Sequence, residues 1–238
     1  MTSTKIEKLK QLIKANPNFV FLSGAGVSTL SGIPDFRSKN GLYQKFKNAE
    51  YLLSHEALIN DTEAFYKFYK EQMLLNGIKP NIIHNKLANW EKENRIGYVI
   101  TQNIDGLHSL AGNERVVELH GTVHRNYCLK CNTQYSLKYI KDSDGIPKCK
   151  CGGLIRPDVV LYGESLHEGV FETCYDALNK TDLLIVAGTG LTVSTAGGIV
   201  SMFKGKHLVI LNNEATPFDY RASLIIRDDL ANIFKQLS

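Results

Sequence analysis

Four short apolar runs constrain the fold of this chain more than any other feature of its sequence. Each run ends in small or polar residues, and the four are NFVFLSG (18–24), YVITQN (98–103), DLLIVAGTG (182–190) and HLVILNN (207–213). Segments with helical periodicity separate them, among them residues 62–75 and 81–94. Strands that are apolar on both faces and alternate with helices are typical of a parallel sheet. The sequence therefore predicts an α/β fold with a Rossmann-like parallel sheet, helices on both of its faces, and ligands at the carboxyl ends of its strands.

Four of the five cysteines are arranged as two close pairs. Cys128 and Cys131 are separated by two residues, and after 17 more residues Cys149 and Cys151 are separated by one. Tetrahedral zinc takes four thiolate ligands, and four cysteines leave no open position for water. We therefore expect one structural zinc ion per chain at these cysteines. The fifth, Cys174, falls on the apolar face of a helical pattern, and we expect it to pack in the core.

Two segments interrupt the alternation of strands and helices and predict a smaller lobe. Residues 37–83 are mostly helical in pattern, whereas residues 121–155 contain the cysteines and have little helical periodicity. A chain of 238 residues, 43% of them hydrophobic, is long enough for one domain with a sizeable core. We expect a single catalytic domain over 1–238. Its large Rossmann-like lobe would span about 1–36, 84–120 and 156–238, and its small helical and zinc-binding lobe about 37–83 and 121–155.

Composition and terminal sequence narrow the possible partners. The net charge is +4, and lysines are mixed with acidic residues without a basic run of the kind that binds nucleic acid. Residues 1–16 have the pattern of an amphipathic helix rather than of a signal peptide, and the apolar run 183–188 is too short to span a bilayer. We expect a cytoplasmic protein with no direct nucleic-acid or membrane partner. The sequence leaves its oligomeric state open.

The residues after the first apolar run suit a dinucleotide. Gly24-Ala25-Gly26 would let the backbone approach a pyrophosphate at the start of the next helix. The next glycine is Gly32, so the spacing differs from the usual dehydrogenase motif, and a tight turn without a ligand is an alternative interpretation. The loop then brings a proline, an acid, an aromatic residue and an arginine close to the glycines, ending in IPDFR (33–37).

Two further groups of polar residues lie at strand ends. The segment TQNID (101–105) carries amide and carboxylate side chains that could recognise an amide and ribose hydroxyls, although turn formation and helix capping would also explain them. His120 follows an apolar run that ends at Leu119. A histidine there could act as a general base, although a structural role is the usual explanation for a single histidine.

Together these motifs resemble those of the sirtuin family, and the pattern is most similar to compact bacterial sirtuins. The resemblance covers nearly the whole chain in order. It rests on GAGVSTLSGIPDFR (24–37), TQNID (101–105), His120-Gly121, the four cysteines, RPDVVLYGE (156–164), GTG (188–190) and ILNN (210–213). The family often has serine where this chain has Gly190, and phenylalanine where it has Tyr162.

The resemblance implies a function and a set of site residues. The expected activity is NAD-dependent removal of acetyl or other neutral acyl groups from protein lysines, which gives nicotinamide and O-acyl-ADP-ribose. Acyl-lysine proteins or peptides would be the partners, NAD the co-substrate, and His120 and Asn103 the catalytic residues. The implied NAD-binding residues are Ala25, Thr29, Phe36, Arg37, Gln102, Asn103, Ile104, Asp105, His120, Thr189, Gly190, Asn212 and Asp229. The implied acyl-lysine tunnel is formed by Val160, Tyr162, Gly163 and Glu164.

Three other functions fit parts of the sequence. An ADP-ribosyltransferase on the same fold would share the NAD site, but the VVLYGE segment and His120 favour deacylation. An NAD oxidoreductase is disfavoured by the missing glycine motif, and a zinc-ribbon nucleic-acid module by the small share of the chain that the cysteines occupy. Desuccinylating sirtuins carry a paired tyrosine and arginine, whereas residues 38–55 contain Tyr43 and Tyr51 but no arginine. We therefore expect a preference for neutral acyl groups.

Overall fold

A six-stranded parallel sheet forms the larger part of the structure. The computed structural model describes residues 2–38 and 41–237. The strands follow the order β3-β2-β1-β7-β8-β9, and all neighbours pair in parallel. Their bounds are β1 Phe19–Ser23, β2 Ile96–Thr101, β3 Val116–Glu118, β7 Leu183–Ala187, β8 His207–Leu211 and β9 Leu224–Ile226. The predicted parallel sheet is thus confirmed, and it includes the short edge strand β9, which the sequence analysis did not identify.

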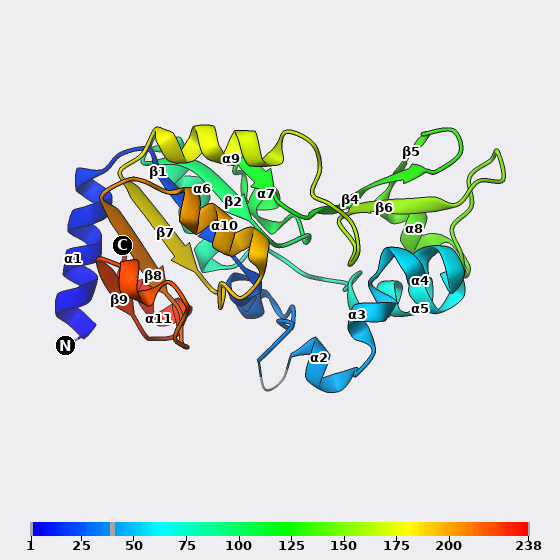
Figure 1. Ribbon diagram of the computed structural model, residues 1–238, viewed down its shortest axis with the longest axis horizontal. Helices are drawn as coiled ribbons and strands as arrows, with labels where there is room; N and C mark the ends of the chain where they lie inside the picture. The colour runs from blue at the N-terminus through cyan, green and yellow to red at the C-terminus, as the bar shows by residue number, and fades with distance from the viewer. Residues whose placement is uncertain (1, 39–40, 238) are drawn as a thin grey trace.

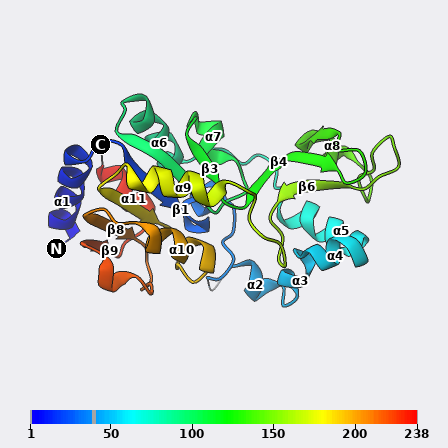
Figure 2. The ribbon, with the colours of Figure 1, turned by 45° about the horizontal axis from the view of Figure 1, so that its top comes forward.

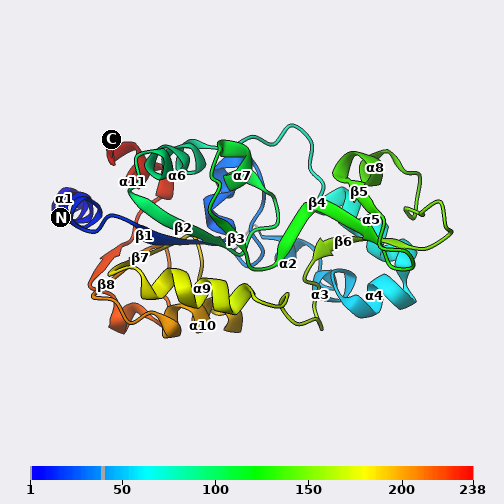
Figure 3. The same ribbon diagram turned by 90° about the horizontal axis from the view of Figure 1, so that it is seen from above.

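Helices cover both faces of this sheet, as predicted (Figure 3). Alternate residues of a strand point to opposite faces. In β1, Phe19 and Phe21 accordingly belong to one core cluster, whereas Val20 and Leu22 belong to the other. The first cluster is completed by α1 (Thr2–Ala15), α6 (Ile82–Lys92) and α11 (Leu230–Gln236). The second is completed by α9 (Val170–Asn179) and α10 (Ser194–Met202), and Cys174 is buried in it as expected.

A second group of elements lies beyond one end of the large sheet (Figures 1 and 2). It contains an antiparallel sheet of order β5-β4-β6, whose strands are β4 Gly121–Cys128, β5 Gln134–Ser136 and β6 Ile155–Val159. One hydrophobic cluster joins β4 and β6 to the helices of residues 42–72. Those helices are α2 Leu42–Lys45, α3 Ala49–Leu52, α4 His55–Asn60 and α5 Thr62–Gln72, and α8 (Leu137–Asp142) packs beside β4 and β5. The lobe boundaries given above remain a prediction.

The connection between the two sheets places the functional residues. The chain leaves β3, passes through Leu119 and His120, and enters β4 at Gly121. The neighbouring strand β2 ends at Thr101, and the loop after it leads into α7 (Leu107–Ala111). Within the described residues, none of the helices combines the length and the apolar character that crossing a membrane requires.

Candidate active site

A cavity of about 1030 Å³ opens at the carboxyl edge of the large sheet. Its lining includes residues of the loops that follow β1, β2, β7 and β8. It extends to Tyr69 in α5 and to Leu53 and Met73, the residues that follow α3 and α5. In an open parallel sheet, ligands bind in the crevice outside the carboxyl ends of the strands, at a point where the strand order reverses. Here β2 lies on one side of β1 and β7 on the other, so the cavity occupies that point.

Every residue for which the sequence predicts a role with NAD or acyl-lysine lines this one cavity. They come from seven separate stretches of the chain, which are residues 25–37, 102–105, 120, 160–164, 189–190, 212 and 229. The four cysteines do not line it. The structure therefore brings the predicted cofactor and substrate residues together and keeps the predicted metal ligands apart from them.

The glycine loop and the loop after β7 touch each other through residues without side chains. A Cβ added to Gly26 would lie 2.8 Å from the Cα of Gly188, and one added to Gly24 would lie 2.6 Å from the Cβ of Thr189. Gly188 itself adopts a positive φ of 64°. The two backbones can meet only because these positions are glycine. Main-chain atoms and small side chains consequently form this part of the cavity wall, which suits a bulky phosphate-bearing ligand.

The polar residues after β2 form a network with the glycine loop. The Asn103 amide donates both of its hydrogens, to the carbonyl of Gly24 at 3.1 Å and to the Ser28 hydroxyl at 3.0 Å. Ser28 in turn donates to Asp105 Oδ2 at 2.7 Å. With both amide hydrogens taken, a ligand contact of Asn103 falls to its Oδ1 atom. Ser28 was not among the predicted site residues.

The Asp105 carboxyl lies at the buried end of this network. Burial raises its pKa, while hydrogen bonds from the Leu107 backbone and the Ser28 hydroxyl oppose the rise. The backbone N–H of Leu107 donates to Oδ1 at 2.8 Å, so both carboxylate oxygens have a donor. Asp105 thereby fixes the loop from Asn103 to α7 in position beside the cavity.

His120 is held with a defined tautomer. Its Nδ1 lies 2.9 Å from the Gln102 carbonyl, which can only accept, so Nδ1 carries the hydrogen and Nε2 carries the lone pair. Nε2 lies 3.3 Å from the Thr195 hydroxyl at the cavity wall. Burial lowers the pKa of His120, and the hydrogen bond to Gln102 partly offsets this. The imidazole is therefore neutral near pH 7, in the form that can accept a proton.

Gly121 allows the chain to turn sharply after His120. Its φ is +71°, and an added Cβ would lie 2.0 Å from the carbonyl oxygen of Asp158 in β6. The carbonyl of His120 accepts from the Val160 N–H at 3.0 Å. The histidine backbone is therefore hydrogen-bonded to the segment that is expected to hold acyl-lysine.

Glu164 lies in the cavity wall, but its carboxylate is engaged by the protein. Arg156 donates to both oxygens, His55 Nδ1 lies 2.8 Å from Oε1, and the Leu161 N–H donates to Oε2 at 2.9 Å. Burial would raise the pKa of Glu164, but the Arg156 guanidinium and the other donors bring it down to about 2. Glu164 thus ties residues 159–164 to β6 and to the start of α4, and this contact could not be inferred from the sequence motif.

Tyr162 also has partners that the sequence did not indicate. Its hydroxyl is hydrogen-bonded to that of Tyr43, which lines the cavity, and the guanidinium of Arg37 lies 5.3 Å from the centre of the Tyr43 ring. Its backbone pairs with the Leu53 carbonyl and the His55 N–H. Tyr51, the other tyrosine considered above, does not line the cavity.

Three of the residues expected to bind adenosine are hydrogen-bonded to backbone groups close to them in the sequence. Asp229 caps α11, because its Oδ1 accepts from the Ala231 N–H at 2.7 Å. The Asn212 amide donates to the carbonyl of Glu214 at 3.0 Å, and the Thr189 hydroxyl accepts from the Leu191 N–H at 3.2 Å. These contacts orient the side chains at the cavity rim and leave their other polar atoms for a ligand.

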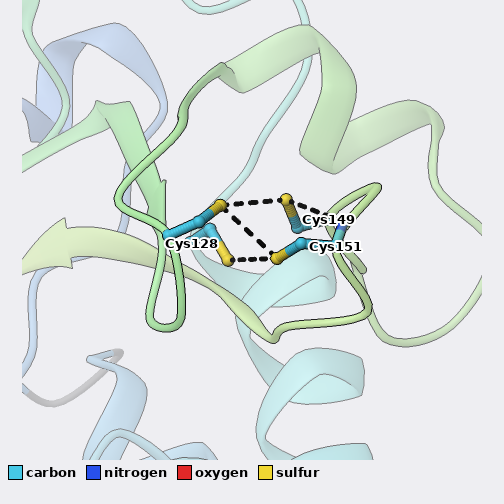
Figure 4. A group of neighbouring side chains, drawn as sticks. Cys128, Cys149 and Cys151 are labelled. Atoms are coloured by element: carbon cyan, nitrogen blue, oxygen red, sulfur yellow. Dashed lines mark hydrogen bonds between the residues drawn. The ribbon is translucent and has the colours of Figure 1, made fainter.

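The four paired cysteines form a compact cluster (Figure 4). Their Sγ atoms all lie within 4.8 Å of one another. Four sulfurs bound at about 2.3 Å to one tetrahedral zinc would lie about 3.8 Å apart, so the cluster is of the right size. The Tyr135 hydroxyl and the Lys130 N–H donate to Cys149 and Cys128, as expected around thiolates. The residues present therefore fit one structural zinc ion.

Two buried histidines support the network from behind. His108 Nε2 lies 2.9 Å from the Ser23 hydroxyl, which donates to Thr101 Oγ1, and Thr101 Oγ1 accepts from the Asn103 N–H. The ring of His84 packs against that of His108 with centroids 4.7 Å apart. His84 accepts from the Asn81 N–H through Nδ1 as part of the capping box of α6. Both rings are almost completely buried.

The burial of His84 predicts an acid-sensitive stability. Burial lowers its pKa from 6.5 to about 4, so below pH 6.5 the unfolded chain takes up a proton that the folded chain does not. The free energy of unfolding should therefore fall as the pH drops. Between neutral pH and about pH 5, the contribution of His84 to this fall should be about 2 kcal/mol. Denaturant titrations of the wild type and of His84→Leu across this range will test this. The variant should show a flatter pH dependence, and equal slopes would contradict the assignment.

The parallel sheet, the glycine-walled cavity at its carboxyl edge and the separate cysteine cluster define a Rossmann-like dinucleotide-binding protein with a zinc module. A family model described as the Sir2 family matches residues 24–195. An NAD-dependent protein deacetylase of Clostridium acetobutylicum is 46% identical over 237 residues, and the match covers 97% of each chain. An NAD-dependent protein deacetylase of Staphylococcus epidermidis is 45% identical over 242 residues, and the match covers 100% of this chain and 98% of that one.

Solved structures give the same result. A structure of Sir2 with a deacetylated p53 peptide and 3′-O-acetyl-ADP-ribose superposes with a TM-score of 0.90 at 36% identity, over 98% of this chain and 96% of that one. A structure of Sir2 bound to an acetylated peptide gives a TM-score of 0.85 at 34% identity, with the same coverage. This chain belongs to the Sir2 family.

Proposed function

We propose that this protein is an NAD-dependent protein-lysine deacylase that removes acetyl or other neutral acyl groups and yields nicotinamide and O-acyl-ADP-ribose. The observation that carries the proposal is that one cavity holds the glycine loop, the Asn103 network and a neutral His120 with its Nε2 at the wall. The names of the relatives as NAD-dependent protein deacetylases and the acetyl-ADP-ribose and peptide in the Sir2 structures support it.

Residues of five chain segments would hold NAD. Ala25, Thr29, Phe36 and Arg37 form the wall next to the glycine loop, and Thr189, Gly190, Asn212 and Asp229 form the wall on the other side of β1. Asn103, Ile104 and Asp105 would hold the nicotinamide end, with Asn103 Oδ1 as an acceptor for an amide, and Gln102 would bind ribose. When bound, NAD supplies an ADP-ribosyl group that accepts the acyl oxygen as nicotinamide leaves.

His120 would act as the general base. Its Nδ1–H is fixed on the Gln102 carbonyl, so Nε2 is the atom that takes a proton from a ribose hydroxyl. Because burial lowers its pKa, the ring is unprotonated at neutral pH and needs no prior loss of a proton. Asn103 has no ionisable group, and its catalytic role would be to orient the nicotinamide end.

The acyl-lysine would bind along residues 160–164. Val160 and Tyr162 present apolar surface, Gly163 has a positive φ of 87°, and Glu164 holds the segment through Arg156 rather than through substrate. Burying four lysine methylenes would contribute about 3 kcal/mol. This energy depends little on the sequence around the lysine, and acyl-lysine proteins or peptides are therefore the proposed partners.

Cys128, Cys131, Cys149 and Cys151 would hold one zinc ion with a structural role, outside the cavity. In reducing compartments, paired cysteines bind metal rather than form disulfides, so a zinc site of this kind supports a cytoplasmic location. We propose no direct contact with nucleic acid, since lysines are mixed with acidic residues and the sequence has no basic run.

The acyl preference can be tested with a panel of peptides. Arg37 is the one arginine among the described residues that line the cavity, and we assign it to NAD. A succinyl group would then bury a carboxylate without a cation, which is costly. We expect acetyl-lysine to be processed at least about tenfold faster than succinyl-lysine in kcat/KM. Mass spectrometry of the products from NAD and each peptide will measure this.

The same experiment tests the function itself. Nicotinamide and O-acetyl-ADP-ribose should appear in equal amounts with free lysine peptide. Faster turnover of the succinyl peptide would overturn the acyl preference alone. Transfer of ADP-ribose to protein without loss of the acyl group would overturn the deacylase proposal.

A further inference from the structure

Thr195 contacts the proposed catalytic base. It is the second residue of α10, and its Oγ1 lies 3.3 Å from His120 Nε2. Both side chains line the cavity. Since Nδ1 is hydrogen-bonded to the Gln102 carbonyl, both nitrogens of the imidazole have partners. Nδ1 is held by the residue after β2, and Nε2 by the first turn of α10.

The direction of this hydrogen bond follows from the tautomer. Nδ1 donates to Gln102, so Nε2 has the lone pair, and the Thr195 hydroxyl must donate to it. A hydroxyl can both donate and accept. Once a substrate O–H bond breaks and its proton forms an N–H bond at Nε2, the same hydroxyl can turn and accept from that N–H. A methyl group could do neither.

Thr195 has no evident role in building its own helix. The N-cap of α10 is Val193, and no side chain caps the helix. Among the residues that the structure describes, His120 is the one hydrogen-bond partner recorded for the Thr195 hydroxyl. The hydroxyl is only partly buried, so removing it leaves no deeply buried polar atom unpaired.

We propose that Thr195 is a positioning residue for His120. In the resting enzyme its hydroxyl donates to Nε2 and holds the imidazole with this nitrogen at the cavity. When substrate binds, the substrate hydroxyl takes its place as the donor to Nε2. After proton transfer, the Thr195 hydroxyl accepts from the Nε2–H of the charged ring. This inference rests on the proposed function, because it assigns Thr195 to the step in which His120 takes a proton.

The test compares two reactions of the same enzyme. Loss of nicotinamide precedes the step that needs the base, so nicotinamide exchange reports on NAD and acyl-lysine binding, and deacetylation reports on both steps. Thr195→Val keeps the side-chain shape and removes the hydroxyl. We expect it to slow the single-turnover rate of deacetylation about three- to tenfold, the usual effect of one hydrogen bond, with nicotinamide exchange nearly unchanged.

Two further variants make the result specific. Thr195→Ser retains the hydroxyl and should restore the deacetylation rate to within about twofold of the wild type. Thr173→Val makes the same substitution on α9, where the hydroxyl bonds to the Gly169 carbonyl outside the cavity, and should leave both rates unchanged. If Thr195→Val is poorly folded by its melting temperature, Thr195→Ala and Thr195→Ser are compared instead.

Equal losses in exchange and deacetylation, or no loss in either, would overturn the role of Thr195. So would a serine variant as slow as the valine variant. Failure of the proposed function is distinct, because the wild type would then yield no O-acetyl-ADP-ribose and no free lysine peptide.

Discussion

Replacing His120 with alanine is expected to slow deacylation by about 10²–10⁴-fold, the usual contribution of a general base. The variant removes an imidazole at the cavity wall whose Nδ1 is held by the Gln102 carbonyl and whose Nε2 is held by the Thr195 hydroxyl. Nicotinamide exchange should survive in part, because it precedes the base-dependent step. The measurement is single-turnover product formation beside nicotinamide exchange for the same preparation.

Folding of the His120→Ala variant should be almost unaffected. The imidazole faces the cavity, and its contact with Gln102 uses a carbonyl that the cavity can hydrate. The melting temperature should stay within about 3 °C of the wild type. His207→Ala, at the amino end of β8 and therefore at the opposite edge of the sheet from the cavity, is the matched control and should retain full activity.

A different outcome would give His120 a structural role. In that case the variant would lose stability, and the folded fraction would deacetylate at the normal rate. A well-folded variant with nearly wild-type deacetylation would refute the proposed mechanism.

Cys128→Ala should release zinc and unfold the antiparallel sheet. Structural zinc contributes about 10–16 kcal/mol of apparent binding free energy in small peptides, and three remaining thiolates hold it far less well. Cys128 is the last residue of β4, Cys131 lies in the loop before β5, and Cys149 and Cys151 lie in the loop between α8 and β6, so the ion would fasten the two ends of this segment together. Metal analysis should fall from one zinc per chain to nearly none, with loss of activity, because β6 leads directly into residues 160–164.

Cys174→Ala provides the control for this experiment. Cys174 is buried in α9, where burial raises the pKa of its thiol to about 12, so it is a protonated core residue. The variant should keep one zinc and its activity, with a loss of stability of about 1 kcal/mol. An active wild-type enzyme that contains no zinc would contradict the metal assignment.

The sequence predicted the architecture well because its main signals are local. Apolar runs such as 183–187 form buried strands wherever they are covered on both faces, and the alternation with helices then fixes their parallel arrangement. β9 was missed because three residues are too few to show a pattern. The cysteine cluster could be predicted in the same way, because the short spacing within each pair already indicates a metal site.

The contacts that orient the site were not predictable, because they join distant residues. Ser28 meets Asp105 across 77 positions, and His120 meets Thr195 across 75. Glu164 was expected in the acyl-lysine tunnel because of its motif, yet its carboxylate is occupied by Arg156 and His55. A motif identifies which residues gather at a cavity, whereas the hydrogen-bond partner of each atom depends on the folded backbone.

The passage of the chain through His120 and Gly121 has a mechanical consequence. This residue pair joins the edge of the large sheet to the first strand of the small one, and the backbone of His120 is bonded to Val160 beside it. In any rotation of the small sheet about this joint, atoms near the axis move least and the cysteine cluster at the far end moves most. His120 would thus keep its position relative to the large sheet while the loops that carry the cysteines move.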